Sequence, residues 1–176
     1  MSLDGYIARA DGDVAWLDEA TEKKPPSEDY GYHAFMDSVD LLILGRKTYE
    51  KVLSMGEWFY GEKRVIVLSG EPISFPASVP ATVSHSSESP EALMRRLGDE
   101  GVARAYVDGG VTVQRFLKAG LIDRLTVTVI PVVLGGGIPL FGSLDESLWL
   151  TLENAQSYDD GLVQITYQVA PARAAS

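Results

Sequence analysis

The sequence predicts an α/β fold built around a mostly parallel sheet. In the middle of the chain, short runs of apolar residues alternate with amphipathic helical segments, which is the pattern of parallel strands joined by crossover helices. The last third differs, because two β-forming segments, 148–158 and 162–169, flank the turn Asp159-Asp160-Gly161 and predict a hairpin. We therefore expect a parallel sheet with antiparallel strands at its edge.

Glycine, proline and helix-capping residues mark the boundaries of the elements. Asp11-Gly12-Asp13 predicts a turn, and residues 23–27 a polar loop in which Ser27 caps a helix that ends near Ser38. Pro90 is expected at the first position of a later helix. The remaining strands are expected at 41–45, 64–69, 81–85, around Tyr106 and at 124–130, and the remaining helices at 46–55, 90–101 and from Val111 to a capping Gly120. Residues 1–170 are expected to form a single domain, and residues 171–176 a flexible tail.

A paired-glycine turn joins the strand at Tyr106 to the helix that follows it. A helix that begins directly after glycine offers free backbone N–H groups and the positive end of its dipole, which suits an anion such as pyrophosphate. Gly109 and Gly110 also leave out two Cβ atoms where phosphates would approach the backbone. The alternative is that these glycines serve tight packing alone.

A second turn of the same kind follows the apolar strand Leu41–Leu44. Gly45 ends that strand, and Arg46, Lys47 and Thr48 begin a helix. Cations at a helix N-terminus conflict with the dipole, and a bound phosphate would remove the conflict. The spacing does not fit a P-loop, because the lysine follows an arginine and no glycine lies five residues before Gly45. The alternative is a solvated basic turn. Two helix starts suited to phosphate, on separate strands, favour a dinucleotide over a mononucleotide as the ligand.

Composition excludes several classes of function. The chain has 176 residues, 45% of them hydrophobic, and a formal net charge of −10, so we expect neither nucleic acid nor an anionic membrane as a partner. It has no cysteine and two histidines far apart, His33 and His85, so we expect no metal site. Without a membrane-length apolar run or a signal-peptide pattern, a cytoplasmic protein is expected.

The order of these motifs resembles the dihydrofolate reductase superfamily. The similarity is greatest to its bacterial branch related to the reductase domain of riboflavin biosynthesis, the RibD C-terminal domain. The matching motifs cover most of the chain in the family's order: 1–8, 44–49, 67–69, 107–112, 120–123 and 130–141. The resemblance implies a three-layer dihydrofolate-reductase-like fold, with helices on both faces of the sheet and the C-terminal hairpin at its edge.

The same resemblance implies a reductase that uses NADPH to transfer hydride to a pterin-like or pyrimidine-like ring. Arg46 is the candidate for the 2′-phosphate that distinguishes NADPH from NADH, since arginine pairs selectively with phosphate. The implied cofactor contacts are Gly45, Arg46, Lys47 and Thr48 for phosphates, Leu68 and Ser69 for adenosine, Gly109, Gly110, Val111 and Thr112 for the pyrophosphate, and Ile7 and Ala8 for the nicotinamide.

Asp29 falls where the family's helix acid is found, which implies a catalytic role in supplying a proton to the substrate ring. The alternative is that Asp29 merely favours the first turn of its helix. His33, one turn later, is an implied substrate contact, although a structural histidine is the alternative. Asp4 and Trp16 are also implied at the substrate, where Asp4 has the alternative role of fixing the turn at Gly5.

The sequence departs from the family in two places. Members resembled here have a hydrophobic strand before the opening motif, at the centre of the sheet, whereas this sequence starts at Met1 inside that motif. Without this central strand, backbone N–H and C=O groups of the two adjacent strands would lack hydrogen-bond partners. Catalytic competence is therefore expected to depend on what replaces the strand. Asp108 also stands where riboflavin-type domains show glutamate, and no cluster for a ribose phosphate is evident.

These departures leave several functions open. Candidate substrates are dihydrofolate and 5-amino-6-(5-phosphoribosylamino)uracil, and a dihydrofolate-reductase-like protein is favoured over a committed riboflavin enzyme. A non-catalytic module that binds NADP or flavin nucleotides is the alternative, followed by an interaction protein with empty glycine turns. A homodimer is expected from the resemblance and from the apolar C-terminal hairpin, whose faces need cover.

Overall fold

The structure is a computed structural model that describes residues 1–21 and 28–170. Its contacts divide the chain into two compact units. The central unit is Asp29–Ala119, and the terminal unit combines Met1–Glu28 with Gly120–Ser176. Ser27, the polar loop at 23–27 and the tail at 171–176 lie outside the described residues. The expectation of a single domain stays a prediction.

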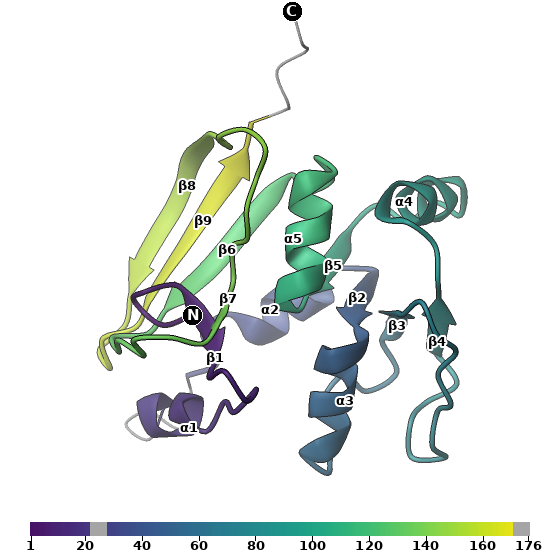
Figure 1. Cartoon of the computed structure of the whole chain (residues 1–176), viewed down its shortest axis with the longest axis horizontal. Helices are drawn as coiled ribbons and strands as arrows, with labels where there is room; N and C mark the ends of the chain where they lie inside the picture. The colour runs from purple at the N-terminus through teal and green to yellow at the C-terminus, as the bar shows by residue number, and fades with distance from the viewer. Residues whose placement is uncertain (22–27, 171–176) are drawn as a thin grey trace, which may run out of the picture. The chain divides into compact units, whose positions relative to one another are not determined.

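The central unit contains the parallel sheet that the sequence predicts (Figure 1). Its strand order is β4-β3-β2-β5, and every neighbouring pair is parallel. The strands are β2 (Leu41–Gly45), β3 (Arg64–Leu68), β4 (Val83–Ser86) and β5 (Ala105–Asp108), and the helices are α2 (Tyr32–Asp37), α3 (Arg46–Ser54), α4 (Pro90–Asp99) and α5 (Gly110–Lys118). The alternation of strands and helices in this segment is thus confirmed.

Burial explains why these segments form this sheet. β2 lies between two strands, and its residues Leu41–Leu44 have no exposed surface, as in a strand with both faces covered. α3 connects β2 to β3, and α4 connects β4 back to β5 in the opposite direction along the sheet, so right-handed crossovers place the two helices on opposite faces. One face carries a core formed by Met36, Leu42, Leu44, Tyr49, Val65, Val67, Val79 and Val83.

α2 begins later than the sequence indicates. Tyr30 and Gly31 have positive φ angles of 53° and 76°, so the chain turns at these residues before the helix starts at Tyr32. Asp29 stabilises the turn, because its Oδ1 accepts a hydrogen bond from the Gly31 N–H at 2.9 Å. The expectation that Asp29 lies in the first turn of the helix is therefore wrong.

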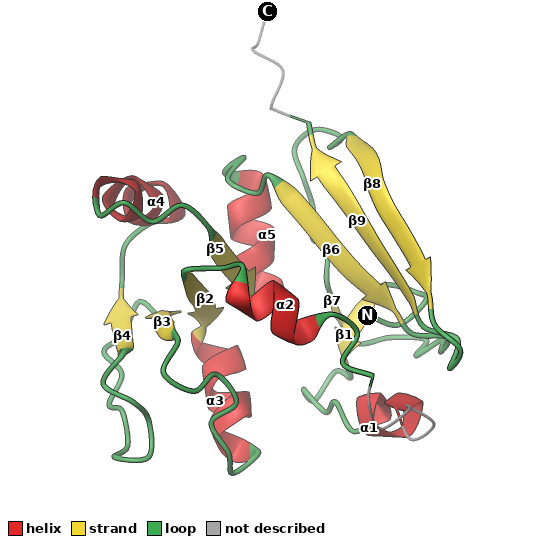
Figure 2. Ribbon diagram, turned by 180° about the vertical axis from the view of Figure 1, so that it is seen from behind, coloured by secondary structure: helices red, strands yellow, loops and turns green. Residues whose placement is uncertain are grey.

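The terminal unit contains an antiparallel sheet in the order β6-β9-β8 (Figure 2). β8 (Leu150–Ser157) and β9 (Val163–Val169) form the predicted hairpin around a Gly161 with φ 89°, and β6 (Arg124–Val129) lies on the other side of β9. These strands form a sheet separate from the parallel one. The sequence did not predict three short elements, which are β1 (Tyr6–Ala8), its antiparallel partner β7 (Ile138–Pro139), and α1 (Trp16–Thr21).

The first residues extend the edge of β6. Ser2 forms a parallel bridge with Ile130, and the Ile130 N–H donates to the Met1 carbonyl at 2.8 Å. Ser2 is fully buried, and its Oγ accepts a hydrogen bond from the Tyr6 N–H. Met1 and Ser2 thus supply ladder bonds beyond the end of β6, while β5 is an edge strand among the described residues.

Candidate functional site

The two glycine turns predicted from the sequence lie at the ends of neighbouring strands. β2 and β5 are parallel with Leu44 opposite Asp108, so both strands end at the same edge of the sheet. α3 begins there after Gly45, and α5 begins there after Gly109 (Figure 1). Leu68, at the end of β3, lies opposite Gly45 on the other side of β2. Carboxyl ends of parallel strands are where open α/β sheets bind ligands.

The two turns share one pattern and pack reciprocally. In Gly45-Arg46-Lys47-Thr48 and in Gly109-Gly110-Val111-Thr112, a glycine precedes the helix and a threonine is the third helical residue. A Cβ atom on Gly45 would collide with Thr112 Oγ1, and one on Gly109 would collide with Thr48 Oγ1. Each glycine therefore makes room for the threonine of the other turn.

This packing changes the interpretation of Gly109. Its missing Cβ makes room for Thr48 rather than for a phosphate, and its φ of 95° is one that few other residues adopt. The packing alternative that the sequence raised for Gly109 thus explains its missing Cβ, and the same packing also explains Gly45. Its consequence is that the N-termini of α3 and α5 are held next to each other.

The paired helix starts fit a group that carries two phosphates. Gly45 and Gly109 have no side chain with which to cap α3 and α5, so among the described residues no capping side chain covers these two helix starts at one edge of the sheet. The surface over them is accessible, because Arg46 and Lys47 are exposed and Val111 is 56% exposed. The residues present are therefore suited to hold a dinucleotide pyrophosphate.

Arg46 is already engaged by acidic residues. Its Nε donates to Glu50 Oε1 at 2.7 Å, one helical turn away on α3. Glu71 also acts electrostatically on Arg46. Glu71 is held at the end of β3, where Ser69 Oγ donates to its carbonyl at 2.7 Å and accepts from its N–H at 3.1 Å. Ser69 and Arg46 thus belong to one polar corner beside Gly45.

Asp29 serves the start of α2. Its Oδ2 lies 2.7 Å from His33 Nδ1 and accepts from the His33 N–H at 3.1 Å, while Oδ1 accepts from Gly31. These bonds, above all the one from the His33 side chain, lower the pKa of Asp29 to about 2. Asp29 is therefore ionised near neutral pH, which suits its structural alternative better than proton donation. The His33 side chain is 82% exposed.

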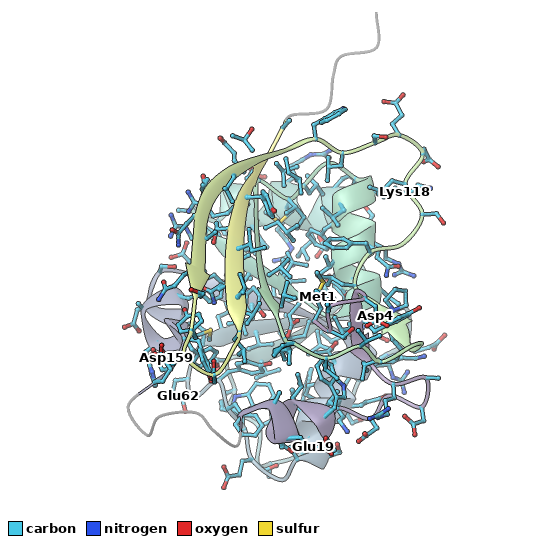
Figure 3. All side chains as sticks on the ribbon, turned by 90° about the vertical axis from the view of Figure 1, so that its left-hand side faces the viewer. Met1, Asp4, Glu19, Glu62, Lys118 and Asp159 are labelled. Carbon is cyan, nitrogen blue, oxygen red and sulfur yellow. The ribbon has the colours of Figure 1, made fainter. Side chains whose placement is uncertain are left out.

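The other predicted residues belong to the terminal unit. Asp4, which is labelled in Figure 3, accepts from the N–H groups of Leu134 at 3.1 Å and Gly135 at 2.8 Å, so it fixes the glycine loop. Hydrogen bonds, first that of Ser2, lower the pKa of Asp4. Ala8 is buried in β1, and a Cβ on Gly137 would collide with its carbonyl oxygen.

Trp16 and Ile7 complete the predicted set in this unit. Trp16 begins α1 and is 3% exposed, and its buried Nε1 makes no hydrogen bond within the described residues. Ile7 lies in β1 beside Ala8 and is partly buried. The roles of both residues toward a nicotinamide or substrate stay predictions.

Asp108 is the functional candidate that the site assignments missed. It ends β5 directly before Gly109, and its Oδ1 accepts from the Gly109 N–H at 2.7 Å. Burial raises the pKa of Asp108. Burial, and after it the charge of Asp108, raises the pKa values of Tyr32, Tyr60 and Tyr106, so three phenol groups lie within electrostatic reach of Asp108. In the sequence, the position of Asp108 between a strand and a glycine turn was the signal that could have identified it as a candidate.

The part of the chain that the structure describes contains neither a cluster of metal ligands nor a membrane-spanning helix. No cluster of three or more His, Cys, Asp or Glu residues is placed to hold a metal ion there. No helix in residues 1–21 or 28–170 has both the length and the hydrophobicity needed to cross a bilayer.

Known proteins resemble the chain over nearly its whole length. The Bacillus subtilis (strain 168) protein named Uncharacterized protein YwjB is 38% identical over 169 residues, which are 95% of this chain and 92% of that protein. The crystal structure of a putative riboflavin biosynthesis protein from Shewanella sp. PV-4 is 38% identical with a TM-score of 0.89, covering 97% of this chain and 95% of that one.

The fold extends to more distant proteins. A dihydrofolate reductase from Enterococcus faecalis, solved in complex with NADP(H), is 20% identical with a TM-score of 0.63 and covers 96% of this chain and 92% of that one. The family model described as RibD C-terminal domain matches residues 1–164. The resemblance inferred from the sequence is thus confirmed, and the chain belongs to the RibD C-terminal domain family.

Proposed function

We propose that this protein is a reductase that uses NADPH to transfer hydride to a pterin-like or pyrimidine-like heterocycle. The observation that carries the proposal is the pairing of two helix N-termini, after Gly45 and Gly109, at one edge of the parallel sheet. Two dipoles at adjacent strand ends suit the two linked phosphates of a dinucleotide better than the single phosphate of a mononucleotide. The Enterococcus faecalis enzyme, which has the same fold, was solved with NADP(H).

The residues of the central unit have separate tasks in this proposal. The first N–H groups of α3 and α5 bind the pyrophosphate, Arg46 binds the 2′-phosphate, and Leu68 with Ser69 borders the adenosine. Bound NADPH supplies the hydride, and the protein orients it and excludes water. In the terminal unit, Ile7 and Ala8 remain the proposed cover of the nicotinamide, and Asp4 and Trp16 the proposed substrate contacts.

Reduction of a C=N bond, in the ring of dihydrofolate or in the opened ribosylamino group of the pyrimidine, also needs a proton, because hydride adds to the carbon and the nitrogen must be protonated. We assign the proton to Asp108 rather than Asp29. Burial favours the neutral form of Asp108, whereas the bonds to Asp29 favour its ionised form. Asp29 and His33 remain candidates for contact with the amino edge of the substrate. The candidate substrates are dihydrofolate and the ribosylamino-pyrimidine of riboflavin synthesis.

A non-catalytic nucleotide-binding module is the second candidate. Asp29 favours this candidate, because both of its carboxylate oxygens accept hydrogen bonds from backbone N–H groups at the start of α2. The carboxylate thus has a structural role there instead of a catalytic one. Two measurements on purified protein separate the candidates: the change in NADPH fluorescence on binding, and the loss of NADPH absorbance with dihydrofolate, pterins, flavins or 5-amino-6-(5-phosphoribosylamino)uracil. Binding with turnover supports the reductase, binding without turnover on any of these acceptors supports the module, and absence of NADPH binding contradicts both.

A further inference from the structure

The cation proposed to recognise NADPH is partly neutralised within its own helix. Arg46 Nε and Glu50 Oε1 are 2.7 Å apart, and the two side chains are 49% and 53% exposed. The hydrogen bond from Arg46 to Glu50 raises the pKa of Arg46, which is the expected effect of a close carboxylate on a guanidinium. The positive charge available to a phosphate at this corner is therefore reduced.

A second carboxylate approaches Arg46 from the neighbouring strand. Glu71 follows β3 and is held there by the two hydrogen bonds with Ser69. Its charge acts on Arg46 together with that of Glu50. The Arg46 guanidinium in the corner beside Gly45 is thus influenced by two carboxylates, those of Glu50 and Glu71.

This inference rests on the proposed function. We propose that Glu50 is a specificity-determining residue that limits the preference of this protein for NADPH over NADH. A 2′-phosphate brings close to two negative charges to the corner, whereas the ribose of NADH brings a neutral hydroxyl group that can donate a hydrogen bond to a carboxylate. Glu50 therefore opposes binding of NADPH and leaves binding of NADH unopposed.

Glu50 also holds Arg46 in place, and the two effects have opposite signs. An exposed ion pair between residues i and i+4 orders its partner only weakly. Repulsion between a carboxylate and a doubly charged phosphate several ångströms away, screened by water and salt, corresponds to about a three- to tenfold change in affinity. Replacement by glutamine keeps an acceptor oxygen for Arg46 Nε and removes only the charge, so the repulsion decides the outcome.

The test compares Glu50→Gln with Glu100→Gln by calorimetric titration with NADPH and with NADH, without substrate. Glu100 is the charge control, because it forms an i,i+4 pair with Arg96 and a second pair with Arg64, and its replacement changes the net charge equally. We expect Glu50→Gln to tighten NADPH about three- to tenfold and to leave NADH within about twofold. The gain should shrink at high salt, and Glu71→Gln should act in the same direction.

The outcomes separate this inference from the function on which it rests. If the wild-type chain binds both dinucleotides and Glu50→Gln changes their affinity ratio no more than Glu100→Gln does, or weakens NADPH, the inference is overturned and the proposed cofactor site stands. If the wild-type chain binds neither dinucleotide, the proposed function fails and the inference fails with it.

Discussion

The reciprocal packing of the two glycine turns can be tested by one added methyl group. Gly45 has φ −74° and ψ 154°, which alanine adopts without strain. The cost of Gly45→Ala therefore arises from the collision of the new Cβ with Thr112 Oγ1. Overpacking of this kind costs about 1–3 kcal/mol, of which about 0.4–1 kcal/mol is offset by the lower entropy of the unfolded chain.

A second substitution isolates the collision. Thr112→Ala removes the Oγ1 atom, and the next nearest atom to the added Cβ, Thr112 Cβ, lies at 3.7 Å, an ordinary contact distance. The double variant Gly45→Ala/Thr112→Ala should therefore be more stable than the sum of the single changes predicts, by about 1–2 kcal/mol. Free energies of unfolding from urea titrations of the four proteins give this coupling energy.

Gly70→Ala is the matched control. Gly70 also follows a strand, has no positive φ, and has open space where its Cβ would lie, so its replacement should be neutral or slightly stabilising. Gly45→Ala should in addition weaken NADPH binding, because the helix starts must move apart to admit the methyl group. Additive effects of Gly45→Ala and Thr112→Ala would refute the reciprocal packing on which the proposed site is built.

Three further predictions concern charged residues. Arg46→Ala should weaken NADPH at least about tenfold more than NADH in titrations, with Arg95→Ala on α4 as the control; equal losses would remove the 2′-phosphate assignment. Burial raises the pKa of Asp108, so the folded chain resists an ionisation that the unfolded chain accepts, and Asp108 costs stability as pH rises above 3.8. Asp108→Asn should thus raise the melting temperature at neutral pH but not near pH 3, and slow NADPH oxidation without weakening NADPH binding; unchanged turnover would contradict the proton assignment. The pKa of Asp29 is lowered from 3.8 to about 2, so Asp29 stabilises the fold above that interval and less as pH falls through it. Asp29→Ala should therefore lower the melting temperature at neutral pH, and the difference from wild type should shrink as the pH falls from 4 toward 2; a difference independent of pH would contradict the bonds to His33 and Gly31.

Local signals were sufficient for the larger elements. Ser89 and Pro90 predict the start of α4, and in the structure Ser89 Oγ accepts from the Ala92 N–H at 3.3 Å. The apolar run Leu41–Leu44 is long enough to identify a buried strand. β1 and β7 could not be found in this way, because strands of three and two residues carry no periodicity and depend on pairing with each other.

Asp29 illustrates the limit of a family position as a guide to function. The resemblance supplied a proton donor, but the left-handed Tyr30 and Gly31 bring the Asp29 carboxylate back onto the N–H groups of α2. Asp108 shows the converse. Its pKa depends on burial among residues that are distant in sequence, such as Tyr32 and Tyr60, and no local pattern reports such burial.

The sequence alone determined that a glycine turn and a helix follow each of two apolar strands, and that cations lie at one of these helix starts. Those features are local, since they depend on propensity and on the conformational freedom of glycine. Only the tertiary structure decided that β2 and β5 are neighbours, that each glycine accommodates the threonine of the other turn, and that Arg46 lies under the influence of Glu71. These relations arise from strand order in the sheet, which is fixed by burial of both faces of β2 and by the handedness of the crossovers rather than by any single segment.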